Sequence, residues 1–180
     1  MNIKIKHAGT EIPEYMRTLP VTEKGYLKPW FVKADDFRIV DSDKAMLSIN
    51  KERCWICGQA FKPAEYALVG GPECAKSRAF TEPPCHVECA EYAVQVCPFL
   101  LYPGAKRREA GLAEEATLAH RNANSAVPIK GENPGEHYIF VVKDFSFSKR
   151  FHVMQFTKDK VIEIQFWRDG VRQSALPDSP

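Results

Sequence analysis

The chain has 180 residues, a formal net charge of +2 at pH 7, 44% hydrophobic residues and 27% charged residues. This balance is typical of a soluble globular protein and excludes a disordered or fibrous one. No run approaches the roughly 20 apolar residues that a membrane-spanning helix needs, and the polar start lacks the apolar core of a signal peptide. We therefore expect a cytoplasmic protein without a membrane partner.

The charges are spread evenly along the chain. Even the most basic segment, residues 137–180, has only 7 basic against 5 acidic side chains. Binding of nucleic acid through bulk positive charge needs a stronger excess than this. A nucleic-acid interface would therefore have to be a small local patch.

The first fifty residues predict short mixed elements. We expect a helical turn at residues 13–17 and two short strands at 30–32 and 37–40. A helix is predicted from Asp43 to Lys51, capped by Asp41 or Ser42. Its buried face is expected to hold Ala45, Met46 and Ile49.

All six cysteines fall between Cys54 and Cys97. In a reducing compartment, clustered cysteines bind metal more often than they form disulfides. Cys54 and Cys57 are two residues apart and are followed by Gly58, which is the pattern of a zinc knuckle. About thirty residues later, Pro83-Pro84 precedes a predicted helix on whose first turn His86 and Cys89 share one face.

Two segments between these pairs, residues 64–69 and 78–81, are predicted to form a hairpin through Gly70-Gly71-Pro72. A knuckle, a hairpin and a helix with the second ligand pair make a treble-clef arrangement over residues 52–100. The sequence therefore predicts a structural Zn²⁺ held by Cys54, Cys57, His86 and Cys89.

The second ligand pair has alternatives. Cys85 competes with His86, and Cys74 is a possible substitute ligand or a core residue. Cys97 lies eight residues past Cys89, about 12 Å along an unbroken helix, which is too far for one zinc. A second metal bound by Cys74, Cys85 and Cys97 is a further alternative.

The rest of the chain predicts a connector and a sheet. Residues 104–136 follow a Pro-Gly break and include a predicted helix at 109–121 and an Asn-, Pro- and Gly-rich loop. Strands are expected at 137–143, 151–157 and 161–167, the last two joined as a hairpin by Lys158-Asp159-Lys160. The fold class is thus α+β, with a zinc-centred region at 1–103, a connector at 104–136 and an antiparallel sheet at 137–172 packed on the first region.

Five motifs resemble a family of uncharacterised proteins encoded by phages and bacteria. They are Pro29-Trp30-Phe31, Cys54 to Gly58, Gly71-Pro72-Glu73-Cys74, Glu82 to Ala90 and Cys97-Pro98-Phe99-Leu100. The resemblance favours His86 over Cys85 as ligand, because the position before the His varies in the family pattern. It implies no activity. Related members often carry Asn-Arg where this chain has Ser77-Arg78, so a role built on that Asn does not carry over.

Enzyme classes that use a similar zinc unit fit poorly. A His-Me-finger (HNH) nuclease needs a general-base His on the hairpin, and no His lies between Cys57 and Cys85. A zinc hydrolase needs an open coordination position, and a zinc deaminase needs a His-x-Glu before the Cys pair. We therefore predict a non-enzymatic protein and assign no catalytic residue.

The predicted task is binding of a protein partner, such as a host or defence-system component if the chain is phage-encoded. The alternative is a nucleic-acid-binding zinc-finger module, and a second alternative is an uncharacterised zinc- or cysteine-dependent hydrolase or nuclease. Candidate binding residues are Arg78, Lys106, Arg107, Arg108, Lys149 and Arg150.

Overall fold

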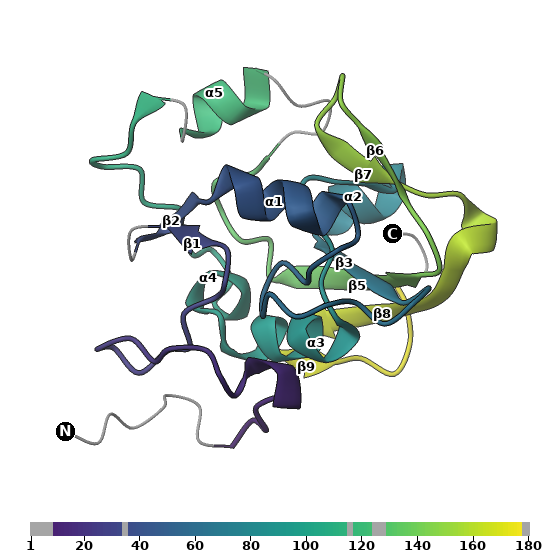
Figure 1. Ribbon diagram of the computed structural model, residues 1–180, viewed down its shortest axis with the longest axis horizontal. Helices are drawn as coiled ribbons and strands as arrows, with labels where there is room; N and C mark the ends of the chain where they lie inside the picture. Colours follow the sequence, from purple (N-terminus) through teal and green to yellow (C-terminus); the bar gives the residue numbers. More distant parts are fainter. Residues whose placement is uncertain (1–8, 34–35, 115–116, 124–128, 178–180) are drawn as a thin grey trace.

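A computed structural model describes residues 9–33, 36–114, 117–123 and 129–177 (Figure 1). The helices are α1 (Ser42–Ile49), α2 (Pro72–Ser77), α3 (Val87–Val96), α4 (Pro98–Leu101) and α5 (Leu118–Ala123), with 3-10 turns at Glu14–Met16 and Lys158–Lys160. The strands are β1 (Val32–Lys33), β2 (Asp36–Val40), β3 (Tyr66–Gly70), β4 (Ala79–Phe80), β5 (Glu136–Val142), β6 (Ser146–Ser148), β7 (Val153–Gln155), β8 (Val161–Arg168) and β9 (Val171–Arg172). The α+β class predicted from the sequence is confirmed.

The central sheet is antiparallel throughout, in the order β3-β5-β8-β9. Its middle strand β5 pairs Phe140 with Leu68 of β3 on one side and Tyr138 with Phe166 of β8 on the other. Six of the seven residues of β5 are buried. Such a continuous apolar run is expected where both faces of a strand are covered.

Each face of this sheet has its own apolar core. Ile139 and Val141 of β5 pack with α3 and Trp167 in one cluster, whereas Tyr138 and Phe140 pack with Phe80 and Met154 in the other. Because successive side chains of a strand point to opposite faces, one strand supplies both clusters. In Figure 1 the sheet lies between α3 and the pair formed by α2 and the smaller β-sheet.

Helix α3 is fixed to the sheet by a buried polar contact. Gln165 of β8 is 2% exposed and donates a hydrogen bond of 2.8 Å to Glu91 of α3. The indole of Trp167 donates a hydrogen bond to the Gln165 carbonyl oxygen at 3.0 Å. A satisfied buried amide of this kind sets the position of the helix on the strand.

Two predicted hairpins are wrong, because their strands pair with other strands instead of with each other. β3 pairs with β5 and β4 pairs with β7, with α2 beginning at Pro72 between them. Likewise β7 belongs to the smaller sheet, in the order β4-β7-β6, whereas β8 pairs with β5. Residues 158–160 form a 3-10 turn that passes the chain from one sheet to the other.

The predicted connector at 104–136 has its two ends hydrogen-bonded together. Gly104 N donates to Asn133 O at 3.0 Å, and Arg107 N donates to Gly131 O at 2.7 Å. Asn133 is 2% exposed, and its side chain donates to the carbonyls of Leu100 and Tyr102. The helix predicted at 109–121 is wrong for 109–113, which are turn and coil, and correct only where α5 begins at Leu118.

The N-terminal expectations are largely confirmed. β1 and β2 pair as an antiparallel hairpin whose connecting residues 34–35 lie outside the described part. Asp41 caps α1 by accepting hydrogen bonds from the backbone of Asp43 and Lys44 at 3.1 and 3.2 Å. Met46, predicted to be buried, is 43% exposed, because the face of α1 toward the protein centres on Ser48.

The strands predicted to form the C-terminal sheet pair with strands from the first hundred residues, since β5 pairs with β3. The division at 103 and 136 stays a prediction. Among the helices of the described residues, none combines the length and the apolar character needed to span a bilayer.

Candidate metal centre

The first pair of thiols lies on a tight turn that follows α1. Cys54 N donates to Gln59 O at 2.8 Å, and Gly58 N donates to Cys54 O at 2.9 Å, which folds the turn back on itself. Gly58 has φ +74°, and a Cβ there would lie 2.5 Å from Cγ of Trp30. Only glycine fits both the left-handed backbone and the indole packed against it.

The second pair lies at the start of α3. His86 is the N-cap of the helix and Cys89 is in its first turn. Just before them, Cys85 pairs with Ala67 of β3 through two backbone hydrogen bonds of 2.8 and 2.9 Å. Trp55 N also donates to Pro84 O at 3.0 Å, which joins the first turn to the start of the second.

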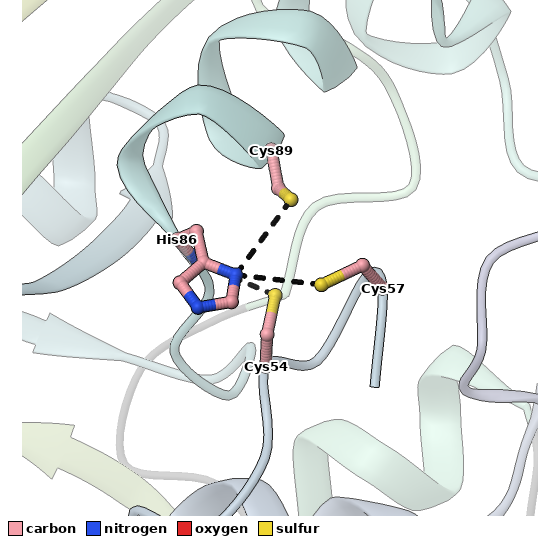
Figure 2. A group of neighbouring side chains, drawn as sticks. All are labelled: Cys54, Cys57, His86 and Cys89. Atoms are coloured by element: carbon pink, nitrogen blue, oxygen red, sulfur yellow. Dashed lines mark hydrogen bonds between the residues drawn. The ribbon is translucent and has the colours of Figure 1, made fainter. Parts of the chain in front are cut away.

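The four side chains converge on one buried point (Figure 2). The ligand atoms of Cys54, Cys57, His86 and Cys89 all lie within 4.8 Å of one another, and all four residues are buried. His86 Nδ1 is 3.3 Å from Cys57 Sγ and 3.9 Å from Cys89 Sγ, and His86 N donates to Cys54 Sγ at 3.3 Å.

These distances match a tetrahedral donor set. Metal–sulfur bonds near 2.3 Å and metal–nitrogen bonds near 2.0 Å place tetrahedral donors roughly 3.5 to 3.8 Å apart. The set of three sulfurs and one imidazole nitrogen suits a borderline-soft divalent cation. The cluster can therefore hold a metal ion such as zinc without a large rearrangement.

The far side of the imidazole fixes its orientation. Nε2 of His86 lies 3.0 Å from the carbonyl oxygen of Ala60. A carbonyl can only accept, so Nε2 carries a hydrogen, and in the neutral ring Nδ1 then presents its lone pair to the three sulfurs. Metal-binding histidines commonly have such a partner on the second nitrogen.

Aromatic rings close the site on the side of His86. Tyr15 stacks on the imidazole with ring centroids 4.3 Å apart, and Phe61 meets it edge-on at 5.3 Å. Lys62 Nζ lies 5.5 Å from the centroid of the Tyr15 ring and 3.9 Å from a carboxylate oxygen of Glu88. These contacts shield the ligand nitrogen from water and restrict the ring.

The ionisation of the cluster is strongly coupled. Burial raises the pKa of Cys54, but hydrogen bonds from Cys57, Cys89 and His86 outweigh this and hold that pKa well below its usual range. Burial lowers the pKa of His86, but its contacts with Cys54 and Cys57 prevail and raise it to about 10. Contacts with Cys54 and Cys57 raise the pKa of Cys89. One negative sulfur is thus stabilised, and a cation would allow the others to ionise as well.

Cys85, the competing ligand, points elsewhere. Its thiol donates to Ala67 O at 3.5 Å, and burial raises its pKa well above the ordinary value. Since neighbours in an extended segment point to opposite sides, His86 faces the cluster when Cys85 faces the core. Among the described residues, the metal-binding group contains His86 and not Cys85.

Cys74 and Cys97 also lie apart from the cluster. Cys74 of α2 packs against the second core, where burial raises the pKa of its thiol. Cys97 follows the last residue of α3, and burial raises its pKa as well. Within the described residues neither thiol belongs to the metal-binding group, so the second metal site at Cys74, Cys85 and Cys97 finds no support.

The candidate binding cations are distributed over separate elements. Arg78 caps α2 in a left-handed conformation with φ 53°. Lys106 lies 3.9 Å from Glu132, and Arg107 donates to Arg38 O at 3.3 Å. Arg108 is exposed beside them, whereas Lys149 and Arg150 are exposed in the turn between β6 and β7.

The residues that surround the imidazole of His86 were not predicted as part of the site from the sequence. Tyr15, Ala60 and Phe61 come from two segments with no ligand pattern of their own. Their role depends on the folding of residues 13–17 against the start of α3. A single sequence holds no local signal for that approach.

Comparisons of this chain with family models, with curated proteins and with solved structures found no match. The resemblance to the phage and bacterial family therefore stays a prediction.

Proposed function

We propose that the chain is a zinc-stabilised binding protein in which Cys54, Cys57, His86 and Cys89 hold one structural Zn²⁺. The observation that carries this proposal is the set of four buried donors within 4.8 Å of one another. Four protein ligands complete the tetrahedral shell of zinc, whereas catalytic zinc keeps one position for water or substrate. A complete shell argues against the zinc hydrolase and nuclease alternatives.

We propose that residues 52–100 form a treble-clef-like zinc unit. The turn at Cys54–Cys57 precedes a helix that carries the second pair, as in that arrangement. The intervening strands β3 and β4 belong to different sheets, so the unit departs from a simple hairpin. The zinc would join this unit to the core, because Cys54, Cys57 and Cys89 are members of the cluster under α3.

The proposed task is binding of a protein partner, with a host component as the candidate if the chain is phage-encoded. The net charge is only +2, and Arg107 and Lys106 are engaged with groups of the chain itself. Nucleic-acid binding, which needs several free cations in one patch, has less support.

The metal proposal is tested with two matched thiol variants. Cys57→Ala removes a proposed ligand, and Cys85→Ala removes an equally buried thiol that points away. Elemental analysis should give one zinc per chain for the wild type and for Cys85→Ala, and none for Cys57→Ala. Retention of the full metal content by Cys57→Ala, or its loss in Cys85→Ala, would contradict the assignment.

The binding proposal is tested with a tagged wild-type chain in a bacterial lysate. One host protein should be retained in near-stoichiometric amount, and retention should fall when a chelator removes the zinc. A mobility shift of DNA or RNA that weakens steeply as salt rises would instead support the nucleic-acid alternative. Retention of no protein from the host lysate would count against the proposed task.

A further inference from the structure

The turn between β6 and β7 carries two adjacent exposed cations, Lys149 and Arg150, away from the candidate metal centre. β6 and β7 pair from Ser146–Gln155 to Ser148–Val153, and residues 149–152 form the tip. Lys149, Arg150, Phe151 and His152 are all exposed, and Phe151, a large apolar side chain, is 39% exposed. In Figure 1 the hairpin lies at the upper edge of the molecule, away from α3.

The cations at this tip have no acidic residue near them in the sequence. From Phe145 to Lys158 the chain contains no Asp or Glu. Within the described part of the chain, neither Lys149 nor Arg150 is in a salt bridge, whereas Lys51, Arg168 and Arg172 are each paired with a carboxylate. The tip therefore presents uncompensated positive charge, although the chain as a whole is nearly neutral.

Side chains at the tip also contact one another. The Arg150 guanidinium carbon lies 5.1 Å from the centroid of the Phe151 ring, and the His152 ring meets Phe147 edge-on at 6.3 Å. Below the tip, Val153 and Met154 are 0% and 1% exposed, and β7 is the middle strand of its sheet. A partner would meet an Arg–Phe pair at the end of a strand whose next residues are buried in the core.

We infer that the hairpin tip is the contact surface for an acidic segment of the partner protein. This inference rests on the proposed function and names the chemistry of the partner. Lys149 and Arg150 would form ion pairs with carboxylates of the partner, and the Arg150 pair would be bidentate. Phe151 would enter an apolar pocket of the partner between these carboxylates. Arginine and aromatic residues are the side chains that most often dominate protein interfaces.

The same observations fit nucleic acid less well. Only two cations lie at the tip, so few phosphates could be neutralised. Stacking of a base would use the face of an aromatic ring, and one face of Phe151 is already covered by Arg150. A carboxylate needs no free ring face and can approach the guanidinium in its plane.

The test uses the full zinc-loaded chain labelled with ¹⁵N and a peptide of repeated Glu-Asp-Leu units, about twelve residues long, at low salt. The amide resonances of residues 149–152 should shift on addition of the peptide. The double variant Lys149→Glu with Arg150→Glu should raise the Kd about tenfold or more. Phe151→Ala, which keeps the charge, should also raise the Kd, because the inference gives the ring a contact of its own.

The matched control is Lys24→Glu with Lys76→Glu, which makes the same charge change at exposed lysines elsewhere. It should change the Kd by less than about twofold, since screening limits the effect of distant charges. The inference would be overturned if the control variant weakened binding equally, if the peptide did not bind, or if the shifts lay outside the hairpin. Tighter binding of a single-stranded oligonucleotide of equal charge would also overturn it.

The lysate experiment separates this inference from the proposed function. If the wild-type chain retains a host protein and the hairpin double variant retains as much, the hairpin assignment fails and the proposed function stands. If the wild-type chain retains none, the proposed function fails at its own test.

Discussion

At the residue scale, the direction in which each side chain points decides which residues belong to the candidate site. Cys85 and His86 are adjacent in sequence but point to opposite sides. The thiol of Cys85 donates to Ala67 O, whereas the imidazole of His86 faces three sulfurs. Ala60 O holds Nε2 of His86, and the ring of Tyr15 stacks on its face. The candidate metal centre is therefore specified by the neighbours of the four donors as much as by the donors themselves.

Gly58 offers a stability test with a natural control. Gly58 and Gly111 both have left-handed φ, +74° and +79°, but a Cβ at Gly58 meets Trp30 at 2.5 Å and one at Gly111 meets nothing within 4 Å. Gly111→Ala should cost about 1 kcal/mol of unfolding free energy from the backbone alone. Gly58→Ala should cost about 3 kcal/mol, because the ring must also move. Equal costs in chemical denaturation would show that the Trp30 contact does not matter.

Cys97 predicts a dependence of stability on alkaline pH. Burial raises the pKa of its thiol in the folded chain above the ordinary value of 9.0. The unfolded chain then releases its proton at lower pH than the folded chain. The contribution of the protonated Cys97 thiol to the unfolding free energy is therefore complete below about pH 9. It is lost as the pH rises through the pKa of this thiol in the folded chain.

The measurement compares wild type and Cys97→Ala. The unfolding free energy should fall between pH 8 and pH 10 in both proteins, and it should fall less in Cys97→Ala. Cys74→Ala, which removes another thiol whose pKa is raised by burial, provides the comparison. An identical fall in wild type and Cys97→Ala would show that burial of this thiol is not linked to folding.

At the scale of elements, the sequence predicted what is encoded locally. Asp41 as the cap of α1, the β1–β2 hairpin and the two ligand pairs each depend on residues a few positions apart. The predicted partners of β3, β4 and β7 were wrong. β3 and β4 pair with strands distant in sequence, whereas β7 pairs with distant β4 and also with neighbouring β6, in a short hairpin that the sequence prediction missed. Short apolar runs such as residues 151–157 and 161–167 look alike in sequence, so periodicity could not assign them to different sheets.

Asn133 tests the element that closes the connector. Its side chain donates to Leu100 O and Tyr102 O and accepts from Gly135 N, all at 2.9 to 3.0 Å. Asn133→Ala should cost about 2 to 3 kcal/mol of unfolding free energy, because it removes three hydrogen bonds of a side chain that is 2% exposed and leaves the buried Gly135 N–H without this acceptor.

Asn122 provides the control for that change. It also bonds to backbone, through both N and O of Ile129, but it is exposed. Asn122→Ala should cost less than about 1 kcal/mol, since water replaces its hydrogen bonds. A loss in Asn133→Ala no greater than in Asn122→Ala would mean that the connector is not held by this contact.

At the scale of the whole molecule, the central sheet separates two cores, and the candidate metal centre belongs to only one of them. Cys54, Cys57 and Cys89 join the cluster beneath α3, and Gln165 ties that helix to β8. Bound metal would therefore hold residues 54–57 to the helix and, through the helix, to the sheet. The hairpin tip belongs to the other side, where β7 is anchored by the second core.

The most direct test of the account is X-ray absorption spectroscopy at the zinc edge of the purified chain. The account predicts a four-coordinate zinc with three sulfurs near 2.3 Å and one nitrogen near 2.0 Å, unchanged in Cys85→Ala. A shell with an oxygen from water, with two sulfurs, or with four sulfurs would contradict a closed centre of Cys54, Cys57, His86 and Cys89.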